Sequence, residues 1–428
     1  MDVGKTAGFV VLSLFTFSLV ACEDEPSAPP PNAKPVAKCS ESAIPNRFMI
    51  RWKNGDFSVE TAASREALKE NLLAVAVDQI DFVENDYRVR IQGTPSLESY
   101  LSTHKSPDNW GQIRINADKA WERARGEGVV VAVVDAGVDL KHPQLRNQLA
   151  INAAEIPGNS IDDDHNGYVD DYSGFDFEAG SGSVHDAPNS THHGSHVSGV
   201  IAAEHLADGS GIKGVAPAAK VLPLNFMDDK GNGSVSDAIN AINYAVARGA
   251  KVINASWGAE VCSKILRQTV QDLEAKGVLF ITASGNGDEF DVGVNLDYHP
   301  TFPAAYPFSG HLTVGAMDDS NVLTGFSNFS TRLVHLLAPG WEIWSTVYVD
   351  EKTEFPGYKK MDGTSMAAPF VSGAAAVLWS YRPKATVQQI RQALMASVVV
   401  PNPRFPVFTG GYLNLELALD RLSAEVSP

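Results

Sequence analysis

Residues 129–135 read VVVAVVD, a run of mostly β-branched residues that ends in an aspartate. An uninterrupted apolar run of this length is typical of a strand buried on both faces of a parallel sheet. Similar runs follow at 220–226, 251–255, 278–282 and 312–316, and helical patterns lie near 236–248, 262–276, 366–380 and 386–396. Strands that alternate with helices predict an α/β fold, in which a parallel doubly wound sheet carries helices on both faces.

Polar residues follow three of these predicted strands. Asp135 ends the first, Asn254-Ala255-Ser256 ends the run at 251–255, and Ser284-Gly285-Asn286 follows the run at 278–282. Because the carboxyl ends of parallel strands meet at one edge of the sheet, functional side chains are expected to gather there.

Two further motifs contain a histidine and a serine. Residues 193–199 read HGSHVSG, and residues 363–369 read GTSMAAP at the start of a long apolar helix. Together with the strand that ends at Asp135, they resemble the subtilisin-like serine peptidases, the subtilases, in that family's order of Asp, His and Ser. The resemblance extends over nearly all of 108–428 and includes the segments DLKHP (139–143), GVAP (214–217), VINASWG (252–258), LAPG (337–340) and GYLN (411–414).

The resemblance implies a serine endopeptidase that acts on proteins or peptides. It assigns Ser365 as the nucleophile, His193 as the general base and then acid, and Asp135 as the carboxylate that orients the imidazole. Asn286 matches the family's oxyanion asparagine, and its side-chain amide would donate a hydrogen bond to the tetrahedral intermediate. The rival interpretation is a catalytically silent surface-binding protein that keeps the fold, against which the complete set of four residues argues.

The same resemblance implies two strands that pair with an extended peptide substrate. These are Gly231-Asn232-Gly233 and Ser256-Trp257-Gly258. Of the histidines near His193, His192 is expected to be exposed and inert, and His196 to be structural. No organic cofactor is expected, because the G-x-G-x-x-G match at 209–214 neither follows a predicted strand nor opens a helix.

The N-terminus predicts export. Residues 1–21 contain an apolar run, AGFVVLSLFTFSLVA, which has the length of a signal-peptide core and is short for a bilayer span. Leu19-Val20-Ala21-Cys22 resembles a bacterial lipobox, which predicts lipidation of Cys22; an ordinary signal peptide with an incidental cysteine is the alternative. Residues 22–43 are rich in proline, alanine and charge and predict a tether. The expected product is a membrane-anchored lipoprotein.

Residues 44–92 predict a small unit of strand, helix (about 60–75) and strand that needs a larger partner to be stable. Its segments at 45–50 and 83–86 resemble the first and last strands of a short subtilase propeptide. A polar linker at 93–107 separates it from the catalytic domain at 108–428. Self-cleavage between about residues 91 and 108 would release the enzyme from an anchor on Cys22.

An acidic segment at 162–171 reads DDDHNGYVDD. Alternating oxygen ligands followed by a glycine are what a hard Ca²⁺ ion requires, and Asp162, Asp164, Asn166 and Asp170 are the expected ligands. The glutamate of a complete EF-hand loop is absent, so a solvated acidic loop is the alternative. A second calcium site common in subtilases uses an aspartate soon after the His-Pro pair; Gln144 stands there, and that site is not expected.

The net charge and the cysteines exclude other classes of function. The chain has 34 lysines and arginines against 51 aspartates and glutamates, a net charge of −17 that disfavours a nucleic-acid partner. Three cysteines cannot form a disulfide framework. The other two cysteines, besides Cys22, are Cys39 and Cys262. We expect both to be free thiols rather than to form a disulfide between propeptide and catalytic domain.

Overall fold

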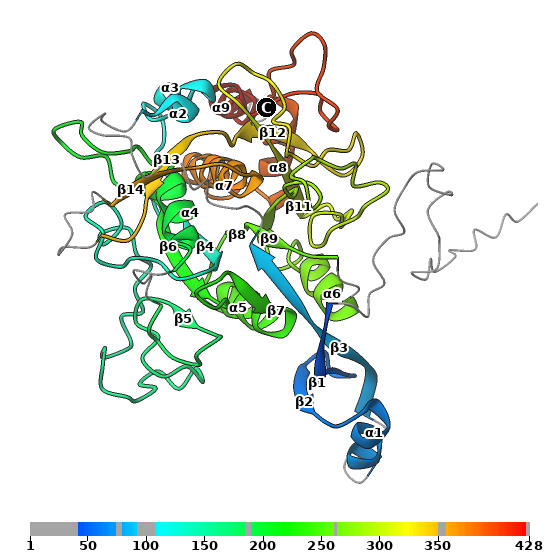
Figure 1. The fold of residues 1–428 in the computed structure, drawn as a ribbon. Coiled ribbons are helices and arrows are strands. Elements are labelled where there is room, and N and C mark those ends of the chain that lie inside the picture. Colours follow the sequence, from blue (N-terminus) through cyan, green and yellow to red (C-terminus); the bar gives the residue numbers. More distant parts are fainter. Residues whose placement is uncertain are drawn as a thin grey trace, which may run out of the picture. The chain divides into compact units, whose positions relative to one another are not determined.

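A seven-stranded sheet, parallel throughout, forms the centre of the molecule (Figure 1). The computed structural model describes residues 42–73, 79–91, 108–184, 190–260, 263–349 and 357–424. All of these residues belong to one compact unit, Val36–Pro428. The sheet order is β12-β11-β10-β8-β4-β6-β5. Its strands are β4 (Val130–Asp135), β5 (Phe175–Asp176), β6 (Lys220–Asn225), β8 (Val252–Ala255), β10 (Leu279–Ala283), β11 (His311–Met317) and β12 (Leu336–Pro339).

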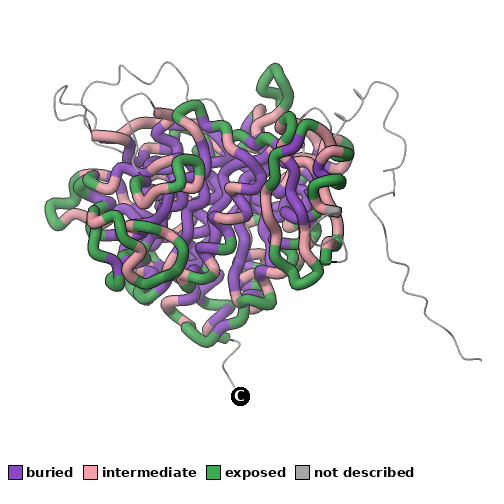
Figure 2. Tube along the Cα trace, turned by 90° about the horizontal axis from the view of Figure 1, so that it is seen from below, coloured by how far each residue is buried: buried purple, intermediate pink, exposed green. Residues whose placement is uncertain are grey.

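The apolar runs of the sequence form the central strands. Their side chains are apolar on both faces because both faces of the sheet are covered. Along β4, Val131 and Val133 face one apolar core, and Ala132 and Val134 face another. This alternation is the period of two that a pleated strand imposes. Figure 2 shows the result, a buried interior surrounded by exposed loops.

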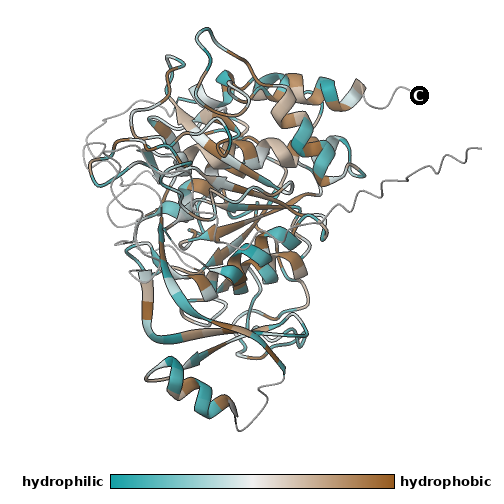
Figure 3. Ribbon diagram, turned by 90° about the vertical axis from the view of Figure 1, so that its right-hand side faces the viewer, coloured by the Kyte–Doolittle hydropathy of each residue, from teal (hydrophilic) through white to brown (hydrophobic). Residues whose placement is uncertain are grey.

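Helices cover both faces of the sheet, as the sequence predicted. On one face α7 (Thr364–Tyr381) and α4 (His193–Ala202) share a core with α8 (Val387–Ala396) and α9 (Leu415–Ala424). The opposite core includes α5 (Val235–Ala247) and α6 (Lys264–Asp272). Figure 3 shows apolar colour along the central strands and a mixture of both colours on the outer helices. Two short helices, α2 (Trp110–Arg114) and α3 (Ala117–Ala120), precede β4, and β13 (Ile343–Thr346) pairs antiparallel with β14 (Tyr358–Met361).

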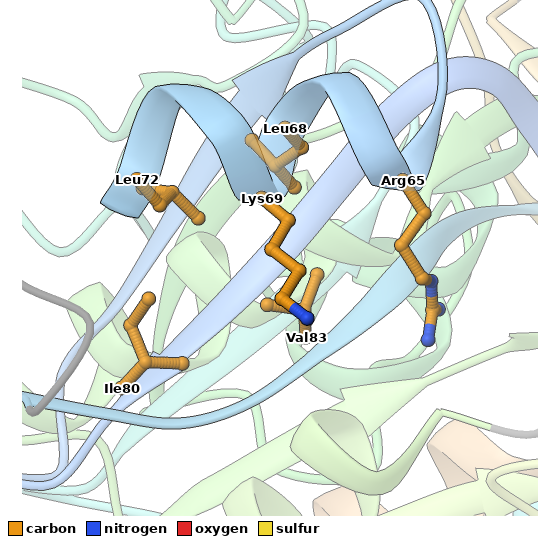
Figure 4. A pocket seen from close by; sticks show the side chains of 6 residues that line it. All are labelled: Arg65, Leu68, Lys69, Leu72, Ile80 and Val83. Carbon is orange, nitrogen blue, oxygen red and sulfur yellow. The ribbon is translucent and has the colours of Figure 1, made fainter. Parts of the chain in front are cut away.

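The N-terminal segment forms a second, antiparallel sheet. Its strands are β1 (Ala43–Trp52), β2 (Phe57–Thr61) and β3 (Ile80–Ile91), with β1 between the other two. The helix expected from about residue 60 begins later, as α1 (Arg65–Leu73), because residues 57–61 extend and pair with β1. An apolar groove with two basic side chains lies between α1 and β3 (Figure 4); it is lined by Arg65, Leu68, Lys69, Leu72, Ile80 and Val83.

Strand β3 also extends beyond this N-terminal sheet and contacts the part of the chain at 108–428. Its C-terminal end pairs with β7 (Asn232–Ser234) and with β9 (Trp257–Gly258), and in Figure 1 it ends beside β9. None of the helices in the described part of the chain combines the length and apolar content that a bilayer span requires.

Candidate active site

Asp135 and His193 form a buried hydrogen-bonded pair. Asp135 is the last residue of β4, and His193 is the first residue of α4. The imidazole Nδ1 lies 2.6 Å from Asp135 Oδ1, and the two side chains are 5% and 0% exposed. Gly194 permits this approach, because a Cβ there would lie 2.2 Å from the Ala136 carbonyl oxygen. With Nδ1 bound to the carboxylate, Nε2 is the imidazole nitrogen left to exchange a proton.

Ser365 is the second residue of α7 and is fully buried. Its hydroxyl donates to the Ser256 carbonyl oxygen at 3.1 Å. His193 Nε2 is buried and has no hydrogen-bond partner among the described residues. A buried imidazole nitrogen without a partner is costly in a finished core, and it is common in a site that awaits a reacting group.

Asn286 follows β10, and its amide is held from one side. Thr364 donates to Asn286 Oδ1 twice, from its backbone N–H at 2.9 Å and from its hydroxyl at 2.7 Å. Since Oδ1 accepts both bonds, the donor of this side chain is Nδ2. Because Thr364 precedes Ser365, the same turn of chain carries the serine and orients the amide. Thr364 was not singled out from the sequence.

The two strands expected to bind substrate are joined by a strand of the same chain. Strand β3 runs antiparallel to both: Val89 pairs with Gly233, Arg90 with Asn232 and Gly258, and Ile91 with Trp257. Gly231 lies immediately before β7; its carbonyl accepts a hydrogen bond from the Ile91 N–H at 3.0 Å. A Cβ on Gly231 would lie 2.8 Å from the Ile91 side chain, so the glycine makes room for it.

Two carboxylates of β3 bind the N-terminal ends of α6 and α5. Neither residue was identified as functional from the sequence. Glu84 accepts hydrogen bonds from Ser263 Oγ (2.7 Å) and from the N–H groups of Lys264 (2.8 Å) and Ile265 (3.1 Å) at the start of α6. Carboxylates are stabilising at helix N-termini, where unpaired N–H groups carry partial positive charge. Burial raises the pKa of Glu84.

Asp86 does the same at the start of α5. It accepts from the Ser236 N–H at 3.1 Å and from the Ser236 hydroxyl at 2.8 Å. It also accepts from the Tyr87 N–H at 2.9 Å and forms an ion pair with Arg47 Nε at 2.9 Å. Burial raises the pKa of Asp86, while the ion pair opposes the rise. An acidic residue inside a strand pattern gives no sequence signal for such a role, since only the docked partner reveals it.

The acidic loop brings together a different set of residues from the four expected as metal ligands. Carboxylate oxygens of Glu155, Asp164 and Asp171 all lie within 4.8 Å of one another. Asn166 lies beside this group and donates to Asp171 Oδ2 at 2.8 Å. Of the four expected residues, Asp164 alone belongs to the group of three carboxylates.

The remaining two expected ligands bind the loop's own backbone. Asp162 accepts from the N–H groups of residues 166 and 167, and Asp170 accepts from those of residues 158, 159 and 160. In the run Asp170-Asp171, nothing in the order of residues indicates which carboxylate faces inward. The structure turns Asp171 inward, where its side chain is fully buried.

Two neighbouring histidines differ in outcome. His192 was expected to be exposed, but it is only 9% exposed and its ring stacks on Tyr348. His196 is fully buried, and its Nε2 lies 2.9 Å from the Ile343 carbonyl oxygen. Burial lowers the pKa of His196 to about 3, so it stays neutral in the folded protein. Cys22, Cys39 and Cys262, and the whole of the linker at 93–107, lie outside the described residues.

A family model described as the subtilase family matches residues 126–413. The chain is 34% identical over 357 residues to fervidolysin from Fervidobacterium pennivorans, an alignment covering 78% of this chain and 46% of that protein. It is 33% identical over 338 residues to subtilisin-like protease 1 of Plasmodium vivax, covering 74% and 52% respectively. The chain thus spans about half the length of these two relatives.

A shorter relative is covered more fully. The major intracellular serine protease of Bacillus subtilis is 34% identical over 302 residues, covering 69% of this chain and 82% of the relative. Among solved structures, the crystal structure of fervidolysin, described as a keratinolytic enzyme related to subtilisin, matches with a TM-score of 0.68 at 25% identity. That match covers 89% of this chain and 61% of the other.

Proposed function

The chain belongs to the subtilase family, and from that premise we propose that it is a serine endopeptidase whose nucleophile is Ser365. The observation that carries the proposal is the buried Asp135–His193 hydrogen bond of 2.6 Å at the carboxyl edge of the sheet. The amide of Asn286, held by Thr364 next to Ser365, supports the same proposal.

In the proposed reaction, His193 Nε2 accepts the Ser365 proton as Oγ attacks the substrate carbonyl carbon. Asp135 keeps Nδ1 protonated and stabilises the imidazolium. The oxyanion receives hydrogen bonds from Asn286 Nδ2 and from the Ser365 backbone N–H at the start of α7. His193 then protonates the leaving amine, and an acyl-enzyme remains on Ser365. Water, deprotonated by His193, hydrolyses this ester and restores the serine.

Peptide hydrolysis by purified variants tests the proposal against the silent-binding alternative. Ser365→Ala should abolish hydrolysis of a fluorogenic peptide and lower stability by only about 1 kcal/mol, because it removes one buried hydrogen bond. Thr313→Val is a matched control, since it also removes a buried hydroxyl that donates to a backbone carbonyl (Ala304 O, 2.7 Å). Wild-type turnover by Ser365→Ala would reject the assignment, and an inactive wild-type protein would favour the silent binder.

We further propose that the unit at 44–92 is a propeptide that inhibits the enzyme by occupying its substrate strands. Support comes from β3, which pairs with β7 and β9 where the substrate is expected. The carboxylates of Glu84 and Asp86 hold it there. Val89 is 2% exposed and belongs to the core that contains Phe226 and Trp257, so the strand is bound by side chains as well as by backbone pairing.

For export and anchoring, we propose a lipoprotein attached through Cys22 and released by self-cleavage between about residues 91 and 108. The anchor would then remain with the propeptide, upstream of the catalytic domain. A multiply acylated N-terminus holds a protein stably on a membrane, whereas a single chain does so marginally. Fractionation of cells should yield a soluble species of about the mass of 108–428 from the wild type, and a membrane-bound precursor from Ser365→Ala. Cys22→Ala should release or mislocalise the precursor. An uncut membrane-bound wild type would contradict the release.

A structural calcium ion is proposed at Glu155, Asp164 and Asp171 rather than at the four residues expected from the sequence. Glu155 is 4% exposed, and its Oε2 has no hydrogen-bond partner among the described residues. The Arg248 guanidinium lies near the group, 3.6 Å from Asp171 Oδ2. Three carboxylates, one with an unpaired buried oxygen, fit a hard cation that binds oxygen. Bound there, calcium would supply charge compensation that stabilises the loop.

Chelation tests the calcium site. A ligand held only by the folded protein at about 100 times its Kd contributes about 2.7 kcal/mol, so chelator should lower the melting temperature. Glu155→Gln should lose this sensitivity, and Asp229→Asn, which changes an exposed carboxylate elsewhere, should keep it. Identical wild-type melting curves with and without chelator would remove the ion from the account.

A further inference from the structure

A proline in α7 withholds a hydrogen bond from the peptide group of Ser365. In an α-helix the carbonyl of residue 365 would accept from the N–H of residue 369. Residue 369 is Pro369, which lies inside α7 and has no N–H. Because Ser365 is fully buried, water is not at hand to replace the missing donor. A buried carbonyl that lacks its partner costs free energy and leaves the helix start less rigidly defined.

The Ser256 hydroxyl supplies a donor in its place. Ser256 Oγ donates to the Ser365 carbonyl oxygen at 3.0 Å, and the Ser365 hydroxyl donates back to the Ser256 carbonyl oxygen at 3.1 Å. The two residues therefore bind each other reciprocally, from the loop after β8 to the start of α7. The Ser256 side chain thus has a contact distinct from the backbone pairing expected of its strand.

Two more buried polar side chains orient the Ser256 hydroxyl. Asn254 Nδ2 donates to Ser256 Oγ at 3.0 Å, so the hydroxyl's own proton is directed toward the Ser365 carbonyl. Ser372 Oγ, two turns along α7, donates to Asn254 Oδ1 at 2.8 Å. Asn254, Ser256 and Ser372 are all fully buried. The chain of hydrogen bonds Ser372–Asn254–Ser256–Ser365 ties α7 to the carboxyl end of β8. The Ser372 hydroxyl has a second, longer contact with the Ala368 carbonyl oxygen at 3.2 Å.

From this arrangement we infer that Ser256 is a positioning residue for the nucleophile, and that Asn254 and Ser372 orient it. The inference rests on the proposed function, since it presumes that Ser365 reacts. The Ser256 hydroxyl fixes the peptide group of Ser365, which sets both the place of Oγ and the direction of the Ser365 N–H toward the oxyanion. Misplacement of a catalytic group by about 1 Å can cost on the order of 100-fold in rate.

Steady-state kinetics of the mature enzyme test the inference. Ser256→Ala should lower kcat by about 10–100-fold. KM should stay within about twofold, because backbone pairing with the substrate does not use the hydroxyl. Thr313→Val, the buried-hydroxyl control on β11, should lower the melting temperature about as much as Ser256→Ala does. It should leave kcat unchanged.

A second substitution distinguishes positioning from general damage to the fold. Pro369→Ala restores an N–H that can donate to the Ser365 carbonyl, and it should keep kcat within about threefold of the wild type. In the Pro369→Ala background, Ser256→Ala should lower kcat by less than about threefold. The N–H of residue 369 and the Ser256 hydroxyl can each donate to the Ser365 carbonyl, so one replaces the other. An unchanged penalty in the Pro369→Ala background, or a wild-type kcat for Ser256→Ala, would overturn the inference.

If Ser256→Ala does not fold, Ser372→Ala serves instead, because alanine is favoured in a helix interior. It should lower kcat by about two- to fivefold with KM unchanged, and a wild-type kcat would count against the relay. Failure of the underlying function looks different: hydrolysis would then survive in Ser365→Ala itself.

Discussion

Lowering the pH from 8 to 5 should destabilise the protein through His142, a buried residue of the DLKHP segment. His142 is 1% exposed. Its Nδ1 accepts the Gln144 N–H at 3.1 Å, so Nε2–H donates to the Gly357 carbonyl at 3.0 Å. The neutral ring is thus fully bonded. A second proton would have to go on Nδ1, against the Gln144 N–H. Burial lowers the pKa of His142 from 6.5 to about 4, which the nearby Asp139 only partly offsets.

The direction and size of this change in stability follow from the linkage between proton binding and folding. Because the pKa is lower in the folded state, the unfolded chain takes up the proton first, and stability falls as the pH drops from about 6.5 toward about 4. At pH 5 the loss from this one group is about 2 kcal/mol relative to pH 8. His142→Gln, which cannot titrate, should therefore show a pH dependence shallower by about that amount.

Denaturant unfolding at pH 8 and pH 5 measures this difference, with Ser365→Ala as the background so that self-digestion does not interfere. Tyr358→Phe is the control, because Tyr358 packs on the His142 ring and donates to Gln144 Oε1 at 2.6 Å. It should lower stability equally at both pH values. An unchanged pH dependence in His142→Gln would refute the reasoning.

Three further outcomes are expected. Asn286→Ala should keep measurable activity with kcat reduced about 100–1,000-fold, the size known for the corresponding asparagine of subtilisin rather than one derived from this structure; an unchanged kcat would remove it from the oxyanion site. Gln144→Ala should destabilise by about 2–4 kcal/mol in denaturant unfolding, because its amide bonds both the N–H and the carbonyl of buried Ile212; a loss below about 1 kcal/mol would contradict this. Glu84→Ala in the uncut Ser365→Ala precursor should speed hydrogen exchange of β3 by about 10–100-fold, and unchanged protection would show that the carboxylate does not hold the strand.

The fold could be predicted from sequence where the signal is local. The apolar run at 129–135 indicates a strand buried on both faces whatever its neighbours are, and β4 forms there. Residues 57–61 carry no comparable signal, because a short, half-buried edge strand is defined by its pairing with β1. His192 failed as a prediction for a similar reason: its burial depends on Tyr348, which is distant in sequence.

The same distinction between local sequence signals and contacts between distant residues applies to the candidate site. Asp135, His193, Asn286 and Ser365 stand in motifs that the family resemblance identifies. Glu155 and Asp171 do not, because a carboxylate in an acidic loop becomes a ligand only through the direction in which the loop folds. The role inferred for the Ser256 hydroxyl was equally hidden, since it depends on the contact with Ser365 across 109 residues of sequence.

The central claim is that Ser365 is a nucleophile activated by His193, and covalent labelling of the mature enzyme tests it most directly. A fluorophosphonate forms a stable ester only with a serine whose proton a neighbouring base accepts. Mass spectrometry of the labelled, digested protein should find one adduct, on the peptide that contains Ser365, and labelling should be lost in Ser365→Ala and strongly slowed in His193→Ala. Labelling of another serine, or undiminished labelling in His193→Ala, would contradict the account.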